Sequence, residues 1–409
     1  MRRIIPLTIL GFASAVFGIA VSAADASAPV LVVPSSPSTV DLTVPLPDAV
    51  QPDPSASWRL VQVGNPEISV PVQLSASVAA DGSPAKQTRV IARIPPAQSS
   101  RKFELLPSGP SAQRAQSRFV FKDNSGTSLG LLEDGKPVLV YNHGTMTCKK
   151  VPQEDSRRSR ACYVHPVWGL DGEVLTDDFP KDHYHHHGIF WAWPHVGIDG
   201  GQYDLWIYNN IQHRFVAWLC RQTGPLAAVL AVENGWFVGD KKVMIERVWM
   251  RSHAADGDRR ALDFEFTWIP IDRPITLWGA DGKSYGGLNL RFAPREDTRI
   301  TVPAGLTKAD LPDTPLEWAD LSARFAGASG PSGAAIFVDP GHPDYPPTWL
   351  TRHYGVLCVG WPGVKPRTFE PGKPIQLNYR IWLHRGAAEL ALLQGAYAAY
   401  QAAMTAKWE

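Results

Sequence analysis

The densest group of chemically reactive side chains in this sequence is a run of histidines near its middle. Residues 182–188 read DHYHHHG, so His183, His185, His186 and His187 lie almost side by side and make up four of the chain's 12 histidines. Imidazole titrates near neutral pH and is also a common metal ligand. The segment is therefore the first candidate for a catalytic or metal-binding site.

The geometry of this run depends on whether it is extended. The apolar residues 189–193 (IFWAW) are typical of a strand entering a core. If the histidine run continues that strand, alternation puts His183, His185 and His187 on one face and His186 on the other. Such a row could bind a divalent Zn, Cu, Fe or Mn ion with a further ligand. A bulge or turn at Tyr184 would instead re-aim His186 toward the same pocket.

Several later strands carry an alternating polar face. Asp263, Glu265 and Thr267 share one side of residues 262–268, and Asn378 and Arg380 share one side of residues 375–384. A sheet face with carboxylates, arginine, histidine and tryptophan suits a carbohydrate site, although any solvent-facing sheet looks similar. We predict that His165, Glu246 and Arg291 join the histidines in one pocket.

The first 23 residues have the layout of a secretory signal peptide. Arg2 and Arg3 precede an apolar run over residues 4–21, and Ala23 ends a small-residue cleavage site. An uncleaved anchor is the competing interpretation, but a proline and two glycines make the run a poor membrane helix. No other long apolar run exists in the sequence. We expect a periplasmic or secreted protein with no further transmembrane segment.

Composition narrows the class of partner. Forty basic and 39 acidic residues leave a formal net charge of +1, which argues against nucleic acid or a membrane surface as the main partner. Four cysteines are too few for a disulfide scaffold. Cys148 and Cys162 flank a basic loop and could pair, whereas Cys220 and Cys358 read as buried thiols. Fifteen tryptophans could fill a core or stack on sugar rings.

The expected fold class is all-β. Residues 24–54 lack a usable periodicity and are predicted to be a flexible linker. Residues 55–107 are predicted to form a small N-terminal β unit, with strands at 58–63, 68–74, 89–94 and 103–106. Residues 108–409 are predicted to form a large antiparallel β-sandwich. Helical periodicity is convincing only at residues 387–407, so one C-terminal helix is expected.

The sequence resembles the PmoA-like proteins of bacteria, a family labelled "methane oxygenase PmoA" and otherwise a domain of unknown function. The resemblance covers about residues 100–405. It rests on the motifs HP at 165–166, DHYHHHG at 182–188, YGGLNLR at 285–291, PG at 371–372 and YR at 379–380. It implies a sandwich similar to the galactose-mutarotase-like supersandwich of secreted sugar-handling systems. Methane oxidation is not expected, because the methane monooxygenase subunits of that name are helical membrane proteins.

These observations predict an exported carbohydrate-active protein, and we expect an enzyme of the sugar isomerase, lyase or hydrolase type that acts on a small carbohydrate or glycan. A non-catalytic sugar-binding or metal-binding protein is the alternative. No nucleophile elbow, P-loop, dinucleotide fingerprint or HExxH motif fixes the reaction. The predicted catalytic residues are His185, His186, His165 and Glu246, the predicted substrate-binding residues are Arg291, Trp191, Trp193 and Arg380, and the predicted metal ligands are His183, His185 and His187.

Overall fold

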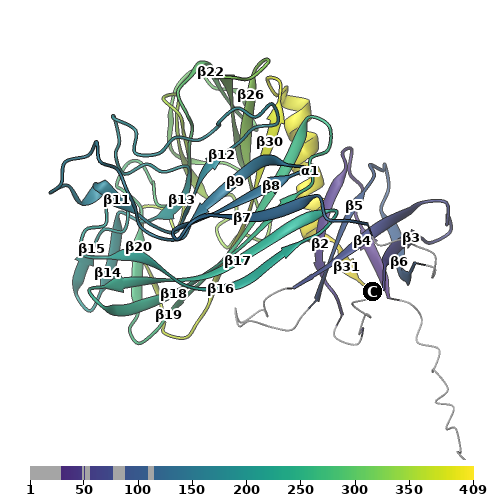
Figure 1. Cartoon of the computed structure of the whole chain (residues 1–409), viewed down its shortest axis with the longest axis horizontal. Coiled ribbons are helices and arrows are strands. Elements are labelled where there is room, and N and C mark those ends of the chain that lie inside the picture. Colours follow the sequence, from purple (N-terminus) through teal and green to yellow (C-terminus); the bar gives the residue numbers. More distant parts are fainter. Residues whose placement is uncertain (1–28, 48–49, 51–55, 77–87, 109–114) are drawn as a thin grey trace, which may run out of the picture.

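The protein is built almost entirely from antiparallel strands, as Figure 1 shows. The computed structural model describes residues 29–47, 50, 56–76, 88–108 and 115–409. The predicted signal peptide lies outside these ranges. No helix in the described part of the chain is long and apolar enough to cross a membrane. The all-β prediction is confirmed, with sheets formed by pairs such as β17 with β18 and β18 with β19.

Two large sheets form the sandwich. The sheet that holds the histidine segment has the order β24-β27-β28-β21-β13-β12-β9-β8-β7. Its strands are β7 (Phe119–Ser125), β8 (Ser128–Glu133), β9 (Lys136–Asn142), β12 (Tyr163–Val167), β13 (Ile189–Ala192), β21 (Gly287–Arg291), β24 (Leu311–Pro315), β27 (Thr348–Arg352) and β28 (Val356–Gly360).

The facing sheet has the order β16-β17-β18-β19-β30-β26-β25-β22-β23. Its strands are β16 (Gln212–Thr223), β17 (Ala227–Val238), β18 (Lys241–His253), β19 (Arg259–Pro270), β22 (Arg295–Val302), β23 (Gly305–Leu306), β25 (Trp318–Phe325), β26 (Ser332–Val338) and β30 (Ile375–Arg385).

Strand alternation decides what each sheet buries. On β19, Phe264 and Phe266 belong to the core between the sheets, whereas Asp263 and Glu265 lie on the opposite face and pair with Arg380 and Asn378 of β30. Trp191 of β13 meets Phe266 across the sandwich, with ring centroids 4.9 Å apart. The predicted alternating polar face is therefore present, on the outside of the second sheet.

The predicted flexible linker at residues 24–54 is wrong for the part of that segment that the structure describes, and residues 24–28, 48–49 and 51–54 lie outside the described residues. Within residues 24–54, β1 (Val30–Val33) and β2 (Val40–Pro45) are strands of a seven-stranded N-terminal sheet with the order β2-β5-β4-β3-β6-β1-β31. Leu42 and Val44 are buried at alternate positions, a period that the surrounding serines and prolines obscure in the sequence. The other strands are β3 (Trp58–Gln62), β4 (Ser69–Ala76), β5 (Thr88–Ile94), β6 (Arg101–Pro107) and β31 (Lys407–Trp408).

The predicted C-terminal helix is present as α1 (Leu390–Thr405), and it lies at the junction of the two units (Figure 1). Ala399 and Ala403 join the core of the N-terminal sheet, while Tyr397 and Tyr400 pack with Phe337 on the outside of the sandwich. Small alanines on one face let the helix lie close to β2. The strand β31 then pairs with β1 and holds the C-terminal segment on the N-terminal unit.

Shorter elements complete the fold. A four-stranded sheet contains β14 (His195–Ile198), β15 (Gly201–Tyr203), β20 (Ile275–Trp278) and β29 (Arg367–Phe369). A two-stranded sheet contains β10 (Met146–Thr147) and β11 (Ser159–Arg160), joined through the 3-10 turn η1 (Ser156–Arg158). Cys148 and Cys162 do not pair, because all four cysteines are free thiols. Cys358 is buried as expected, and Cys220 is only half-buried.

Candidate functional site

The histidine run is a turn and not an extended strand. His183 N donates to Pro180 O at 3.0 Å and His186 N donates to His183 O at 2.9 Å, so the chain reverses around Tyr184 and His185. The predicted row of His183, His185 and His187 on one face is therefore wrong. The turn at Tyr184, considered as the alternative, is present and brings His186 to the other histidines.

Backbone contacts anchor this turn to the sheet on both sides. Arg291 N donates to Gly188 O at 2.8 Å, and Asp177 N donates to Arg291 O at 3.1 Å, so the loop docks on β21. Gly188 is required for close approach to β12, because a Cβ there would lie 2.1 Å from Val164 O. The histidines are thus held on a rigid part of the sheet even though they belong to a loop.

Three aromatic rings lie nearly parallel at the turn. The His183 and His186 ring centroids are 4.7 Å apart at an interplanar angle of 5°, and the His183 and Tyr354 centroids are 5.0 Å apart at 4°. His185 stands perpendicular to His186, 4.7 Å away. The ring of Trp206, which is buried, packs edge-on against His186, with centroids 6.0 Å apart. We call His183, His185, His186, Asp182, Arg291 and Tyr354 the histidine cluster.

A carboxylate and a guanidinium complete the histidine cluster. Asp182 Oδ2 lies 2.9 Å from His183 Nδ1, and Arg291 Nη2 donates to both Asp182 oxygens at 2.9 and 3.0 Å. Partial burial alone would raise the pKa of Asp182, but the hydrogen bond from His183 and the charge of Arg291 outweigh it and lower that pKa. Asp182 is therefore an ionised carboxylate that orients His183.

Buried polar atoms without partners distinguish this cluster. Nδ1 of His185, Nδ1 of His186, and Nε and Nη1 of Arg291 are all buried without a hydrogen bond. Burial, with the charges of His183 and Arg157, lowers the pKa of His185 to about 3. Burial, with the neighbouring imidazoles, also lowers the pKa of His186 well below its ordinary value. Both rings are neutral near pH 7, so each can donate one hydrogen bond and accept another.

His187 and His165 lie beside the cluster in different surroundings. His187 Nδ1 bonds Asp178 Oδ1 at 2.7 Å, and Tyr163 donates to the other Asp178 oxygen at 2.7 Å. The His187 ring is 1 % exposed and packs against Phe179. His165 Nδ1 is 3.0 Å from the Thr176 hydroxyl, and burial lowers its pKa. His187 is therefore held as a structural group.

The arrangement does not support the predicted metal triad. Within the described residues, no three His, Cys, Asp or Glu side chains gather in a geometry that could hold a metal ion. His183, His185 and His187 do not converge, because the turn sends His187 toward Asp178 while His183 faces Asp182. The expected Zn, Cu, Fe or Mn site is therefore not found in the histidine cluster.

Glu246 lies apart from the histidines, in the core between the sheets. Its Oε2 accepts from the indoles of Trp236 at 2.8 Å and Trp268 at 2.9 Å, and its Oε1 accepts from Asn234 at 2.9 Å. His213 Nε2 is 3.2 Å from Oε2. Burial alone would raise the pKa of Glu246, but His213 and these donors hold it at about 2. The prediction that it shares the histidine pocket is wrong, because its alternation on β18 points it inward.

The four predicted substrate-binding residues also lie in different parts of the structure. Arg291 belongs to the histidine cluster. Trp191 and Trp193 are at most 1 % exposed in the core, and Trp193 donates to Trp361 O, so neither ring can face a ligand in this structure. Arg380 lies on the outer face of the second sheet, paired with Asp263. Whether His165, His185, His186, Arg291 and Arg380 act on a substrate stays a prediction.

The sequence did not single out Tyr354 and Trp206 as site residues. Tyr354 sits in the turn between β27 and β28, where an aromatic side chain that is 41 % exposed is the only local signal. Trp206 is buried and contacts Phe190, and both rings belong to the buried core cluster. Only strand pairing places either ring beside residues 183–186.

Comparisons with known proteins classify the chain without assigning an activity. A family model described as "Family of unknown function (DUF6807)" matches residues 128–398, which is well over half of the chain. The chain belongs to this family. The DUF6807 region contains the whole histidine cluster, and no comparison supports the PmoA label.

No curated protein matches the DUF6807 chain. Among solved structures, a putative aldose 1-epimerase from Klebsiella pneumoniae matches with a TM-score of 0.30 and 10% sequence identity. The match covers 88% of this chain and 95% of the epimerase.

Proposed function

We propose that the protein is an exported enzyme that performs proton transfer on a hydroxyl-rich substrate, a sugar or glycoside, at the histidine cluster. The observation that carries the proposal is the set of buried, unpartnered nitrogens of His185, His186 and Arg291, gathered beside the Asp182–His183 pair. Buried polar atoms are normally paired, and a group of them at one place is what a polar ligand would satisfy.

His183 is the best candidate for the proton-transferring group. Asp182 accepts from Nδ1–H, which leaves Nε2 as the basic nitrogen, the same division of roles that a carboxylate imposes on histidine in hydrolases. The pKa of about 3 makes His185 a weak base at neutral pH. We therefore propose His183 as the general base in place of His185 and His186. The two neutral rings would form hydrogen bonds with substrate oxygens.

Arg291 supplies the charge that such chemistry needs. Its Nη2 donates to Asp182. Its buried Nε and Nη1 have no hydrogen-bond partner, so their N–H groups could donate to a substrate oxygen that gains negative charge. The Tyr354 ring, exposed and parallel to His183, offers a face for the C–H surface of a sugar ring. Export rests on the signal-peptide pattern of residues 1–23, and the resemblance to PmoA-like proteins enters as a likeness without methane oxidation.

The proposal is tested by screening the purified protein on sugars, glycosides and polysaccharides for isomerised, eliminated or hydrolysed products. With an active substrate in hand, His183→Ala should lower kcat by about 100-fold or more, the usual scale for losing a general acid or base. His195→Ala is the matched control, because His195 stacks on Trp278 in the four-stranded sheet. Equal activity of wild type and His183→Ala would overturn the assignment.

A non-catalytic sugar-binding protein is the second candidate, favoured by the stacked and exposed Tyr354 ring. It predicts saturable binding of a sugar with no product in any assay, and loss of that binding in Tyr354→Ala. Turnover that depends on His183 decides for the enzyme.

A further inference from the structure

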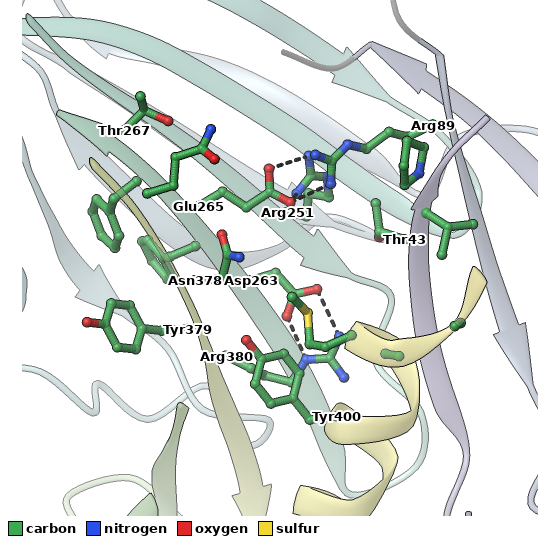
Figure 2. Close-up of a pocket in the computed structure, with 18 residues that line it drawn as sticks. Thr43, Arg89, Arg251, Asp263, Glu265, Thr267, Asn378, Tyr379, Arg380 and Tyr400 are labelled. Atoms are coloured by element: carbon green, nitrogen blue, oxygen red, sulfur yellow. Dashed lines mark hydrogen bonds and ion pairs between the residues drawn. The ribbon is translucent and has the colours of Figure 1, made fainter. Parts of the chain in front are cut away.

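A polar cavity lies where the N-terminal sheet, the second sandwich sheet and α1 meet. Figure 2 shows its lining, and its volume is about 390 Å³. That volume falls within the roughly 300–1,000 Å³ of small-molecule sites. Its floor is the outer face of β19 and β30, with Asp263, Glu265 and Arg380, and its walls carry Thr43, Arg89 and Tyr400.

Ion pairs fix the charged groups of this junction cavity. Glu265 lies between Arg251, at 2.7 Å, and Arg89, at 2.6 Å, so one carboxylate ties β5 of the N-terminal unit to the sandwich. Arg380 Nε and Nη2 grip Asp263 at 2.6 and 2.8 Å. Arg380 also donates to Asp41 O of β2 at 2.9 Å. The polar groups are therefore held in place before any ligand arrives.

Two buried polar atoms in the lining have no hydrogen-bond partner. They are the Thr43 hydroxyl oxygen and Nε of Arg251, whose side chain is 1 % exposed. A buried polar atom without a hydrogen-bond partner is unfavourable unless something pairs with it. Thr43 and Arg251 come from different units and both line the cavity, so a ligand that bridges the units would bring hydrogen-bonding groups next to both side chains.

The chemistry of the lining points to hydroxyl groups. Burial alone would raise the pKa of Glu265, but the charges of Arg251 and Arg89 lower it, so the carboxylate is an acceptor only. The arginines are donors, and Thr267 and Asn378 can do both. Three arginines against two carboxylates leave one formal positive charge in the lining. Met404, which is 37% exposed, adds an apolar side of the kind that a sugar ring contacts.

We propose that the junction cavity is a binding site for a hydroxyl-rich small molecule, neutral or with one negative charge, of the sugar or sugar-acid class. This proposal does not depend on the reaction at the histidine cluster. Thr43 and Arg89 lie outside residues 128–398, so the site needs the N-terminal unit as well as the DUF6807 region. Occupancy would hold the two units together.

The test is calorimetric titration of the full chain with glucose, galactose, cellobiose and glucuronate. Wild type should bind at least one of them saturably, and Thr43→Val should weaken that binding about tenfold, the effect of one hydrogen bond. The apo Thr43→Val protein should be no less stable than wild type, since the lost hydroxyl has no partner. Thr276→Val, outside the cavity on β20, is the matched control and should bind normally.

Met404→Trp provides a second variant that does not disturb the core. Met404 is 37% exposed at the cavity edge, so the larger ring can occlude the cavity from the solvent side, and binding should be lost. Met404→Ala should bind as wild type does. Binding that survives Met404→Trp but is lost in Tyr354→Ala would belong to the histidine cluster and would overturn the junction site while supporting the proposed function. Absence of binding to all four probes would also overturn it.

Discussion

The Glu246 network and the histidine cluster both bury polar groups, but they treat those groups in opposite ways. Each Glu246 oxygen accepts at least one hydrogen bond from Asn234, Trp236 or Trp268, between the two sheets. In the cluster, Nδ1 of His185 and of His186 is buried without a partner at the edge of a loop. Satisfied burial rigidifies a core, whereas unsatisfied burial next to an accessible surface leaves capacity for a ligand.

The largest loss of stability is expected from a substitution at Glu246. Glu246→Leu should destabilise the protein by about 3–5 kcal/mol, because two indole N–H groups and an amide would remain buried without an acceptor. Denaturant unfolding monitored by tryptophan fluorescence measures this loss. Asp297→Ala, which removes an exposed pair with Arg324, should cost less than about 1 kcal/mol. If the two variants are equally stable, the network is not a structural element.

In the histidine cluster, substitutions are expected to lower activity more than stability. His185→Ala and His186→Ala should each lower kcat by about 100-fold, because each loses a hydrogen bond to a substrate oxygen that gains charge in the transition state. Both should destabilise the fold less than Glu246→Leu does, since neither Nδ1 has a hydrogen bond to lose. Steady-state kinetics and thermal unfolding of the same preparations give both readouts. Unfolding of both variants would make the cluster a structural element.

His187 is a structural histidine beside the cluster, and its burial should make the free energy of unfolding depend on pH. Burial, only partly offset by Asp178, lowers the pKa of His187 to about 4, against about 6.5 in an unfolded chain. The unfolded state therefore binds more protons between these values, and stability falls as the pH drops from about 6.5 toward 4. At pH 5 this loss amounts to roughly 2 kcal/mol.

The measurement is the free energy of unfolding at pH 7 and pH 5 for wild type and His187→Gln. The variant keeps an N–H donor for Asp178 but does not titrate, so its loss between the two pH values should be smaller by roughly 2 kcal/mol. His342, whose pKa burial also lowers to about 4, contributes equally to both proteins and cancels. An identical pH dependence in the two proteins would mean that His187 is not held neutral by the fold.

Local patterns predicted much of the architecture. The alternation of Leu262, Phe264 and Phe266 with Asp263 and Glu265 predicted one buried and one polar face on β19, and the alanine-rich C-terminal segment predicted α1. Both signals are periodic and need no knowledge of the partner. The same approach failed at residues 30–45, because short strands among prolines have too few alternating positions to stand out.

The sequence by itself determined that the chain is all-β, that a histidine-rich turn or strand lies at residues 183–187, and that polar residues alternate on later strands. Only the tertiary structure decided which of these groups meet. The turn at Tyr184 separated His187 from His183, strand pairing brought Arg291 and Tyr354 to the histidines, and the parity of β18 sent Glu246 into the core. Side-chain direction in a strand is a local property, whereas the neighbour that a side chain meets depends on strand order and sheet packing, which a single sequence does not encode locally.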